Sequence, residues 1–115
     1  MLFLTEKKAQ QVAINYFYEI LERCEIEGKI IIKYGTYYGE LTSPHGNVEN
    51  NMIFSIDSAY TAYRVNRNNA EQDIYSSAVM DIYNVVSKFF FYDEDREWSY
   101  EKSDQLMALA NNIFN

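Results

Sequence analysis

Residues 70–90 read AEQDIYSSAVMDIYNVVSKFF, and this stretch decides the fold class. Its apolar residues recur every three or four positions, which places them along one side of an α-helix. The residues of this broad stripe are Ile74, Ala78, Val79, Ile82, Val85, Val86, Phe89 and Phe90. A helix that is apolar around most of its central turns has to be covered by the rest of the chain. The sequence therefore predicts a helix over residues 70–91 at the centre of the core.

Three other segments also fit helical spacing. The first segment lies between Thr5 and Gly28 and predicts a helix with Thr5 as its N-cap. We expect Gly28 to end this helix, because glycine suits the left-handed position after a helix. The last predicts a helix over residues 99–114, joined to the central helix by a short acidic connection. Residues 52–65 fit helical spacing better than strand spacing, so we expect a helix there with Asn51 as its cap.

A different pattern follows the first helix. Residues 29–41 read KIIIKYGTYYGEL, and three consecutive β-branched isoleucines favour a strand. We expect a small β-hairpin with strands 29–34 and 37–42 that turns near Gly35 and Thr36; a short helix interrupted by two glycines is the alternative. The predicted fold class is α+β and mostly helical, with about four helices packed as one domain, residues 1–115, and a short β-hairpin after the first helix.

Length and charge limit the functions that this chain can have. With 115 residues and 48% hydrophobic composition, it fits a single globular domain. The net charge of −7 is uneven, because residues 1–67 carry about −1 and residues 68–115 about −6. An acidic surface argues against direct binding to a nucleic-acid backbone or to anionic lipid. It favours a basic protein partner, whose approach a negative face accelerates.

The cysteine content and the N-terminus suggest a compartment. Cys24 is the only cysteine and falls on the apolar stripe of the first helix, so we expect a buried, unreactive thiol and no intrachain disulfide. The first residues, MLFLTEKKAQ, lack the basic region and long apolar run of a signal peptide. No stretch approaches the ~20 apolar residues of a membrane span. We therefore expect a cytoplasmic protein with no membrane contact.

The sequence lacks the motifs of most enzymes and cofactor sites. Its single histidine, His45, lies in the loop sequence SPHGN, where we expect it to be solvated. The acidic residues from 93 to 104 alternate like those of a calcium-binding loop, but Trp98 stands where that loop needs glycine. There is no glycine-rich phosphate loop and no HExxH or CxxC motif. We expect no catalytic residue, no metal and no cofactor.

The most unusual stretch is FFFYDEDREW at residues 89–98. Consecutive helical residues step by about 100°, so four aromatic residues in a row cannot all face one core. We expect Phe89 and Phe90 to be core residues, whereas Phe91 and Tyr92 fall off that face. Two interpretations follow for these two rings and for Trp98. Either the chain folds over them and leaves a solvated acidic turn, or they form a recognition patch beside the carboxylates.

The leading functional hypothesis is a non-enzymatic binding module that occupies a basic surface of a partner protein. In composition alone, the chain resembles small acidic inhibitors and immunity proteins encoded by phages and plasmids, a resemblance that rests on no motif. It implies an inhibitor whose carboxylates imitate nucleic-acid phosphates, as in counter-defence proteins. The predicted partner-binding residues are Phe91, Tyr92, Asp93, Glu94, Asp95, Glu97, Trp98, Glu101 and Asp104.

A second hypothesis is a protein that binds or sequesters a small ligand. Its site would be a tyrosine-lined pocket between the hairpin and the helices, with Tyr37 and Tyr38 in its wall and Arg64 or Arg67 holding an anion. A homodimer is compatible with both hypotheses, because exposed rings can self-associate.

Overall fold

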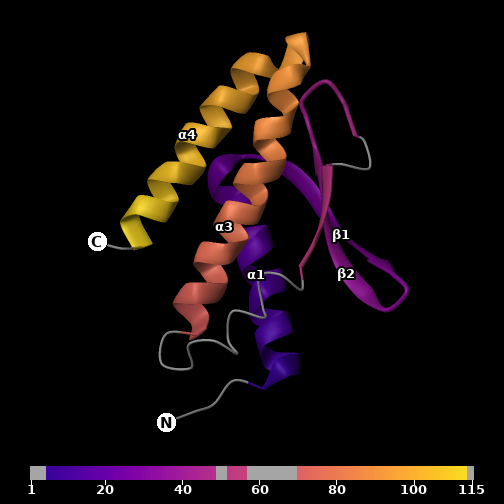
Figure 1. Ribbon diagram of the computed structural model, residues 1–115, viewed down its shortest axis with the longest axis vertical. Coiled ribbons are helices and arrows are strands. Elements are labelled where there is room, and N and C mark those ends of the chain that lie inside the picture. The colour runs from indigo at the N-terminus through magenta and orange to yellow at the C-terminus, as the bar shows by residue number, and fades with distance from the viewer. Residues whose placement is uncertain (1–4, 49–51, 57–69, 114–115) are drawn as a thin grey trace.

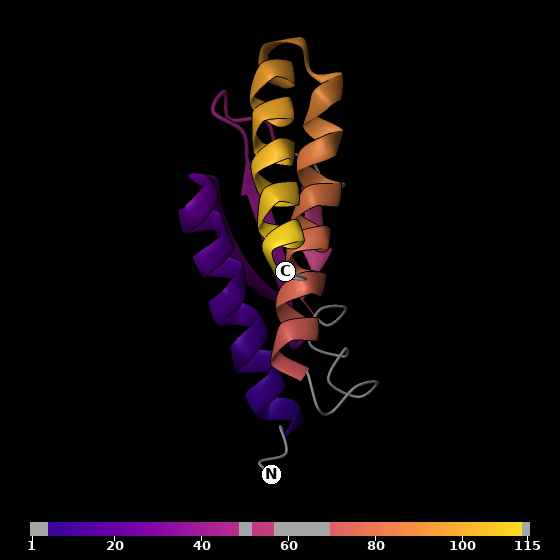
Figure 2. The ribbon, with the colours of Figure 1, turned by 90° about the vertical axis from the view of Figure 1, so that its left-hand side faces the viewer.

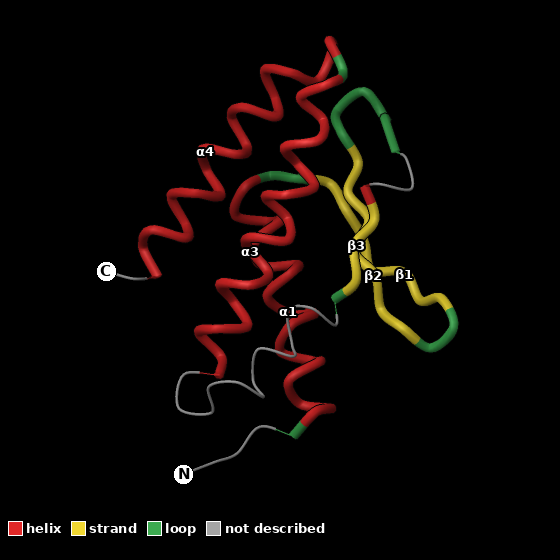
Figure 3. The backbone as a smooth tube through the Cα atoms, viewed as in Figure 1, coloured by secondary structure: helices red, strands yellow, loops and turns green. Residues whose placement is uncertain are grey.

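The computed structural model of the chain describes residues 5–48, 52–56 and 70–113. In this part of the chain, helices pack on one side of a three-stranded antiparallel sheet (Figures 1 and 3). The elements in chain order are α1 (Glu6–Cys24), β1 (Glu27–Lys33), β2 (Thr36–Thr42), β3 (Ile53–Ser55), α3 (Ala70–Lys88), the short 3-10 helices η3 (Phe89–Phe91) and η4 (Asp93–Asp95), and α4 (Arg96–Ile113). The α+β, mostly helical class is confirmed, and so is the hairpin after the first helix.

Helix α1 begins as predicted but ends earlier. The Thr5 hydroxyl accepts a hydrogen bond from the backbone N–H of Lys8 at 3.1 Å, which makes Thr5 the N-cap. At the other end, Glu25 adopts the left-handed conformation (φ 53°) and closes the helix. The prediction that Gly28 ends the helix was wrong. Gly28 lies in β1, where a Cβ atom would come within 2.8 Å of Leu21 Cδ1, so this position needs glycine for close packing rather than for a turn.

The hairpin is longer than predicted, and its turn lies one residue earlier. Tyr34 and Gly35 form a two-residue turn, and both have positive φ (53° and 78°), as a type I′ hairpin turn requires. Gly39, in β2, lies opposite Ile30 on the face of the sheet that packs on α1. A Cβ atom there would lie 2.7 Å from both the Phe17 and the Phe54 rings, so this position has no room for a side chain.

The helix predicted over residues 52–65 was wrong where the structure describes it. Ile53–Ser55 form strand β3, which pairs antiparallel with β2 so that Phe54 lies opposite Gly39. Backbone pairing with an existing strand decided the outcome over helical spacing. The rest of that prediction lies outside the described residues. Within the described ranges the α-helices number three, where about four were predicted.

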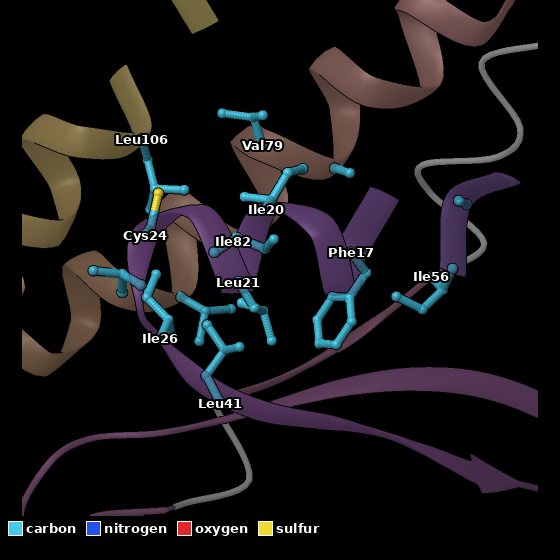
Figure 4. Packing of buried hydrophobic residues seen from close by; sticks show 14 of the residues in the cluster. Phe17, Ile20, Leu21, Cys24, Ile26, Leu41, Ile56, Val79, Ile82 and Leu106 are labelled. Atoms are coloured by element: carbon cyan, nitrogen blue, oxygen red, sulfur yellow. The ribbon is translucent and has the colours of Figure 1, made fainter. Parts of the chain in front are cut away.

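Helix α3 lies at the centre of the core, as predicted. It packs against α1 on one side and runs antiparallel to α4 on the other (Figures 1 and 2). In Figure 4, Phe17 and Leu21 point from α1 toward the strand that carries Leu41, while Leu106 of α4 reaches Cys24. The largest fully buried apolar side chains are Phe17, Phe89, Ile20, Leu41, Met52, Ile56, Ile74, Ile82, Leu106, Val79 and Val86.

The connection between α3 and α4 differs from the prediction. Helix α3 stops at Lys88 rather than near residue 91, and the chain tightens into η3 and then η4. Between them Tyr92 is extended (φ −97°, ψ 118°), which turns the chain back on itself. Helix α4 then begins at Arg96, three residues before its predicted start.

Candidate functional site

The turn between α3 and α4 contains a buried carboxylate, that of Asp95. Its side chain is fully buried, and it binds the loop that follows β2. One oxygen lies 2.7 Å from Nδ1 of His45, the other accepts from the Asn47 amide at 2.5 Å, and Ser43 adds a further hydrogen bond. The Ser43 hydroxyl also accepts the backbone N–H of Asn47 at 3.1 Å. These contacts tie the loop to the turn as one unit.

The pKa of the Asp95 carboxyl reflects this setting. Burial by itself raises the pKa, but the hydrogen bonds from Asn47, His45 and Ser43 and the charge of His45 outweigh burial and hold the pKa below its ordinary value. Asp95 is therefore an ionised anchor, with its oxygens directed into the molecule. The expectation of a solvated His45 needs correction, because one ring nitrogen binds Asp95 although the side chain is about half exposed (52%).

The aromatic residues of the turn divide into two groups. Phe89 is fully buried, and Trp98 and Tyr92 pack against it, with the Trp98 ring edge-on at 5.4 Å. Phe91 is 80% exposed, which makes it the most exposed phenylalanine or tryptophan of the described chain. The two interpretations of residues 89–98 therefore each hold for part of the stretch: the chain partly covers Trp98 and Tyr92, and it leaves Phe91 in solvent.

Phe90 does not join the buried core, contrary to expectation. It is only half-buried, and its ring contacts those of Phe91 and Tyr100 at centroid distances of 5.8 and 5.0 Å. The guanidinium of Arg96 lies 5.1 Å from the centre of the Phe90 ring and pairs with Asp93 at 2.8 Å. Phe90 is thus the base of a surface cluster of rings. Its neighbour Tyr100 is 59% exposed and was missed by the sequence analysis, although its position one turn before Asp104 signals a shared face.

Around these rings, most of the predicted acidic residues are exposed. Helical geometry places Glu97, Glu101 and Asp104 on one side of α4, together with Tyr100. Glu94 is also exposed; its own backbone N–H and the Asn47 amide lower its pKa. We define the acidic–aromatic surface by its exposed members, which are Phe91, Asp93, Glu94, Glu97, Tyr100, Glu101 and Asp104. Asp95 and Trp98 support this surface from within.

A groove lies beside this surface, between α3 and α4. Its volume is about 360 Å³. Phe90 and Tyr100 belong both to the groove and to the ring cluster. The lining residues are Tyr83, Ser87, Phe90, Ser99, Tyr100, Ser103 and Asp104.

The structure describes only the two tyrosines of the predicted small-ligand site. Tyr37 and Tyr38 are neighbours on β2, so their side chains point to opposite faces of the sheet and cannot line one pocket. Arg64 and Arg67 lie outside the described residues. Sequence analysis missed another tyrosine-lined groove, of about 330 Å³, where α1, α3 and α4 meet.

That second groove has two tyrosines and one arginine in its wall. Tyr16 and Tyr75 meet edge to face at 5.0 Å, and Arg23 hydrogen bonds to Tyr75. Burial is the main cause of the raised pKa of both tyrosines, which keeps their hydroxyl groups protonated. The residues that line this groove come from three different helices, so no local sequence pattern predicts it.

Features of catalytic and metal sites are scarce in the described ranges. No group of three histidine, cysteine, aspartate or glutamate side chains in them could hold a metal ion. Burial raises the pKa of the Cys24 thiol, although Lys102 and Arg23 lower it in part, so the reactive thiolate is disfavoured. None of the helices in residues 5–48, 52–56 and 70–113 has the length and apolarity needed to cross a bilayer. Comparisons of the chain with protein-family models, curated proteins and solved structures found no match.

Proposed function

We propose that this protein is a non-enzymatic binding module that occupies a basic surface of a partner protein with its acidic–aromatic surface. The observation that carries the proposal is the contrast within one turn. Asp95 is buried and holds the turn in place, while the carboxylates around it and the ring of Phe91 are exposed. A rigid support beneath exposed rings and charges lowers the entropic cost of binding.

The two kinds of side chain have different roles in this proposal. The carboxylates attract a basic partner and speed its approach, an effect that salt screens. Phe91 and Tyr100 supply apolar contact area that stays favourable in salt. Glu97, Glu101 and Asp104 form a row along α4, and such a row imitates the regular negative charge of a nucleic-acid strand. An inhibitor that blocks a nucleic-acid-binding channel is the form of this function that we favour.

The test is capture of a partner from host lysate with tagged protein, followed by washes at low and high salt. The informative variant carries Glu97→Lys and Glu101→Lys. Its matched control carries Glu22→Lys and Glu71→Lys, which change the net charge equally but lie on exposed positions of α1 and α3. We expect a basic protein that is retained by the wild type and the control and lost with the Glu97/Glu101 variant. Equal retention by all three proteins would contradict the proposal.

A second candidate function is binding of a small ligand in the groove lined by Tyr16, Tyr75 and Arg23. The observation in its favour is the combination of two tyrosine rings with a guanidinium in one lining, which suits an aromatic ligand that carries an acidic group. Thermal-shift screening with nucleotides and aromatic acids tests it. A shift that Arg23→Gln abolishes would support this function, and no shift with any compound of either class would count against it.

A further inference from the structure

Three of the polar groups that line the groove between α3 and α4, those of Ser87, Ser99 and an ionised Asp104, offer only acceptors. The Ser87 hydroxyl donates its proton to the backbone carbonyl of Tyr83 at 2.8 Å. The Ser99 hydroxyl donates to the carbonyl of Val86 at 2.7 Å. A hydroxyl that has donated its one proton can only accept further hydrogen bonds. Asp104 belongs to the same lining, and its carboxylate, when ionised, can accept hydrogen bonds but cannot donate them.

Apart from Ser103, the rest of the lining is aromatic. Tyr83, Phe90 and Tyr100 line the groove, and the Phe90 and Tyr100 rings stand edge to face at 5.0 Å. Ring faces attract cations, arginine most often. The chain already shows this preference next to the groove, where the Arg96 guanidinium lies over the ring of Phe90 at 5.1 Å. Arg96 itself is held by Asp93 and does not line the groove.

A ligand that combines hydrogen-bond donors, a positive charge and an apolar stem therefore suits the acceptors and the rings of this groove. A lysine side chain has all three, with three N–H donors at the end of four methylene groups, and an arginine side chain also combines them. We infer that the groove takes a lysine or arginine side chain of the basic partner, with the stem along the tyrosine rings and the charged end at Asp104. This inference rests on the proposed function, and it adds a specificity pocket to an otherwise diffuse acidic surface.

The experiment is an NMR titration of the ¹⁵N-labelled full chain with a short peptide of alternating glycine and lysine. A glycine–glutamine peptide of the same length is the control ligand. We expect saturable amide shifts centred on Ser87, Tyr100, Ser103 and Asp104 with the lysine peptide only. Asp104→Asn should weaken this binding about tenfold, as expected for the loss of a charged acceptor. Glu22→Gln removes one charge from an exposed position of α1 and should leave the affinity unchanged.

A second variant tests the groove without a change of charge. Ser103→Met places a longer side chain in the lining and should abolish the shifts at Ser87 and Asp104, while the rest of the spectrum shows an intact fold. Shifts confined to Asp93, Glu94 and Glu97 would overturn the groove inference and leave the proposed function standing, because charge attraction alone would then explain them. An unchanged affinity in Asp104→Asn would also overturn it. Failure of the proposed function appears separately, as equal partner capture by the charge-reversal variants.

Discussion

Replacement of Asp95 by alanine should destabilise the protein strongly, although the residue lies in a turn. The carboxylate is fully buried and receives hydrogen bonds from His45, Asn47 and Ser43. Hydrogen bonds to a charged group contribute about 1.5–3 kcal/mol each, but His45 and Asn47 are partly exposed and regain water when the carboxylate is lost. We therefore expect a loss of about 3 kcal/mol, at the low end of the range for breaking a buried ion pair.

Urea unfolding followed by circular dichroism measures this loss directly. An unfolding entropy of about 2.1 cal/mol/K per residue converts a 3 kcal/mol loss into a drop of about 12 °C in Tm for a chain of this length. Asp93→Ala is the matched control, because Asp93 is an exposed aspartate in the same turn whose carboxylate pairs with the exposed Arg96. Its expected loss is below about 1 kcal/mol. Equal losses for Asp93→Ala and Asp95→Ala would refute the reasoning.

The same comparison has a defined pH dependence. The folded pKa of Asp95 lies below its ordinary value of about 4, so the ionised carboxylate stabilises the fold fully above that pH. As pH falls through the folded pKa, the carboxylate takes up a proton and this stabilisation is lost. The difference in unfolding free energy between wild type and Asp95→Ala should therefore shrink in strong acid. A difference that stays constant down to pH about 2 would contradict this assignment.

Three further predictions concern the fold. Gly39→Ala should lower the free energy of unfolding in urea by about 1–3 kcal/mol, because its Cβ would meet two phenylalanine rings. Gly35→Ala, in the open hairpin turn, should lower it by about 1 kcal/mol from its positive φ alone. A larger loss at Gly35 than at Gly39 would count against the packing argument. Cys24 should react with a thiol reagent only after denaturant is added, and fast labelling of the folded protein would show that it is not buried. Tyr18→Phe removes the hydroxyl that accepts a hydrogen bond from the backbone N–H of Ile30 at 3.0 Å on the edge of β1. Because an unpaired strand edge can pair with a second molecule, we expect concentration-dependent self-association of this variant in analytical ultracentrifugation. A strictly monomeric variant would show that Tyr18 does not protect the edge of β1.

The helices were largely predictable because their apolar stripes are long. The stripe of α3 spans its whole length, and Thr5 has the side chain that an N-cap needs. The ends of the elements were less predictable. Glu25 closes α1 in a left-handed conformation that glycine usually adopts, so the sequence pointed to Gly28 instead. Strand β3 has only three residues, too few for a periodicity of its own, and it forms because β2 offers a backbone edge.

The candidate site was predictable only where exposure follows from local geometry. The helical step placed Phe91 off the core face, and Phe91 is exposed. The sequence could not show that Asp93 is exposed and Asp95 buried, because the burial of Asp95 depends on His45 and Asn47. These two residues lie some fifty positions earlier in the chain. Phe90 fits the apolar stripe, but the change from α-helix to 3-10 helix at residue 89 turns it toward the surface. Contacts between distant segments and a local change of helix type leave no periodic signal.

The most direct test of the central claim is the rate at which the captured partner associates with the immobilised protein, measured at low and high salt. If the acidic–aromatic surface binds a basic partner, the wild type should associate fast at low salt and much more slowly at high salt. The Glu97→Lys/Glu101→Lys variant should associate slowly at both. A variant that keeps the wild-type rate and the wild-type salt dependence would contradict the account.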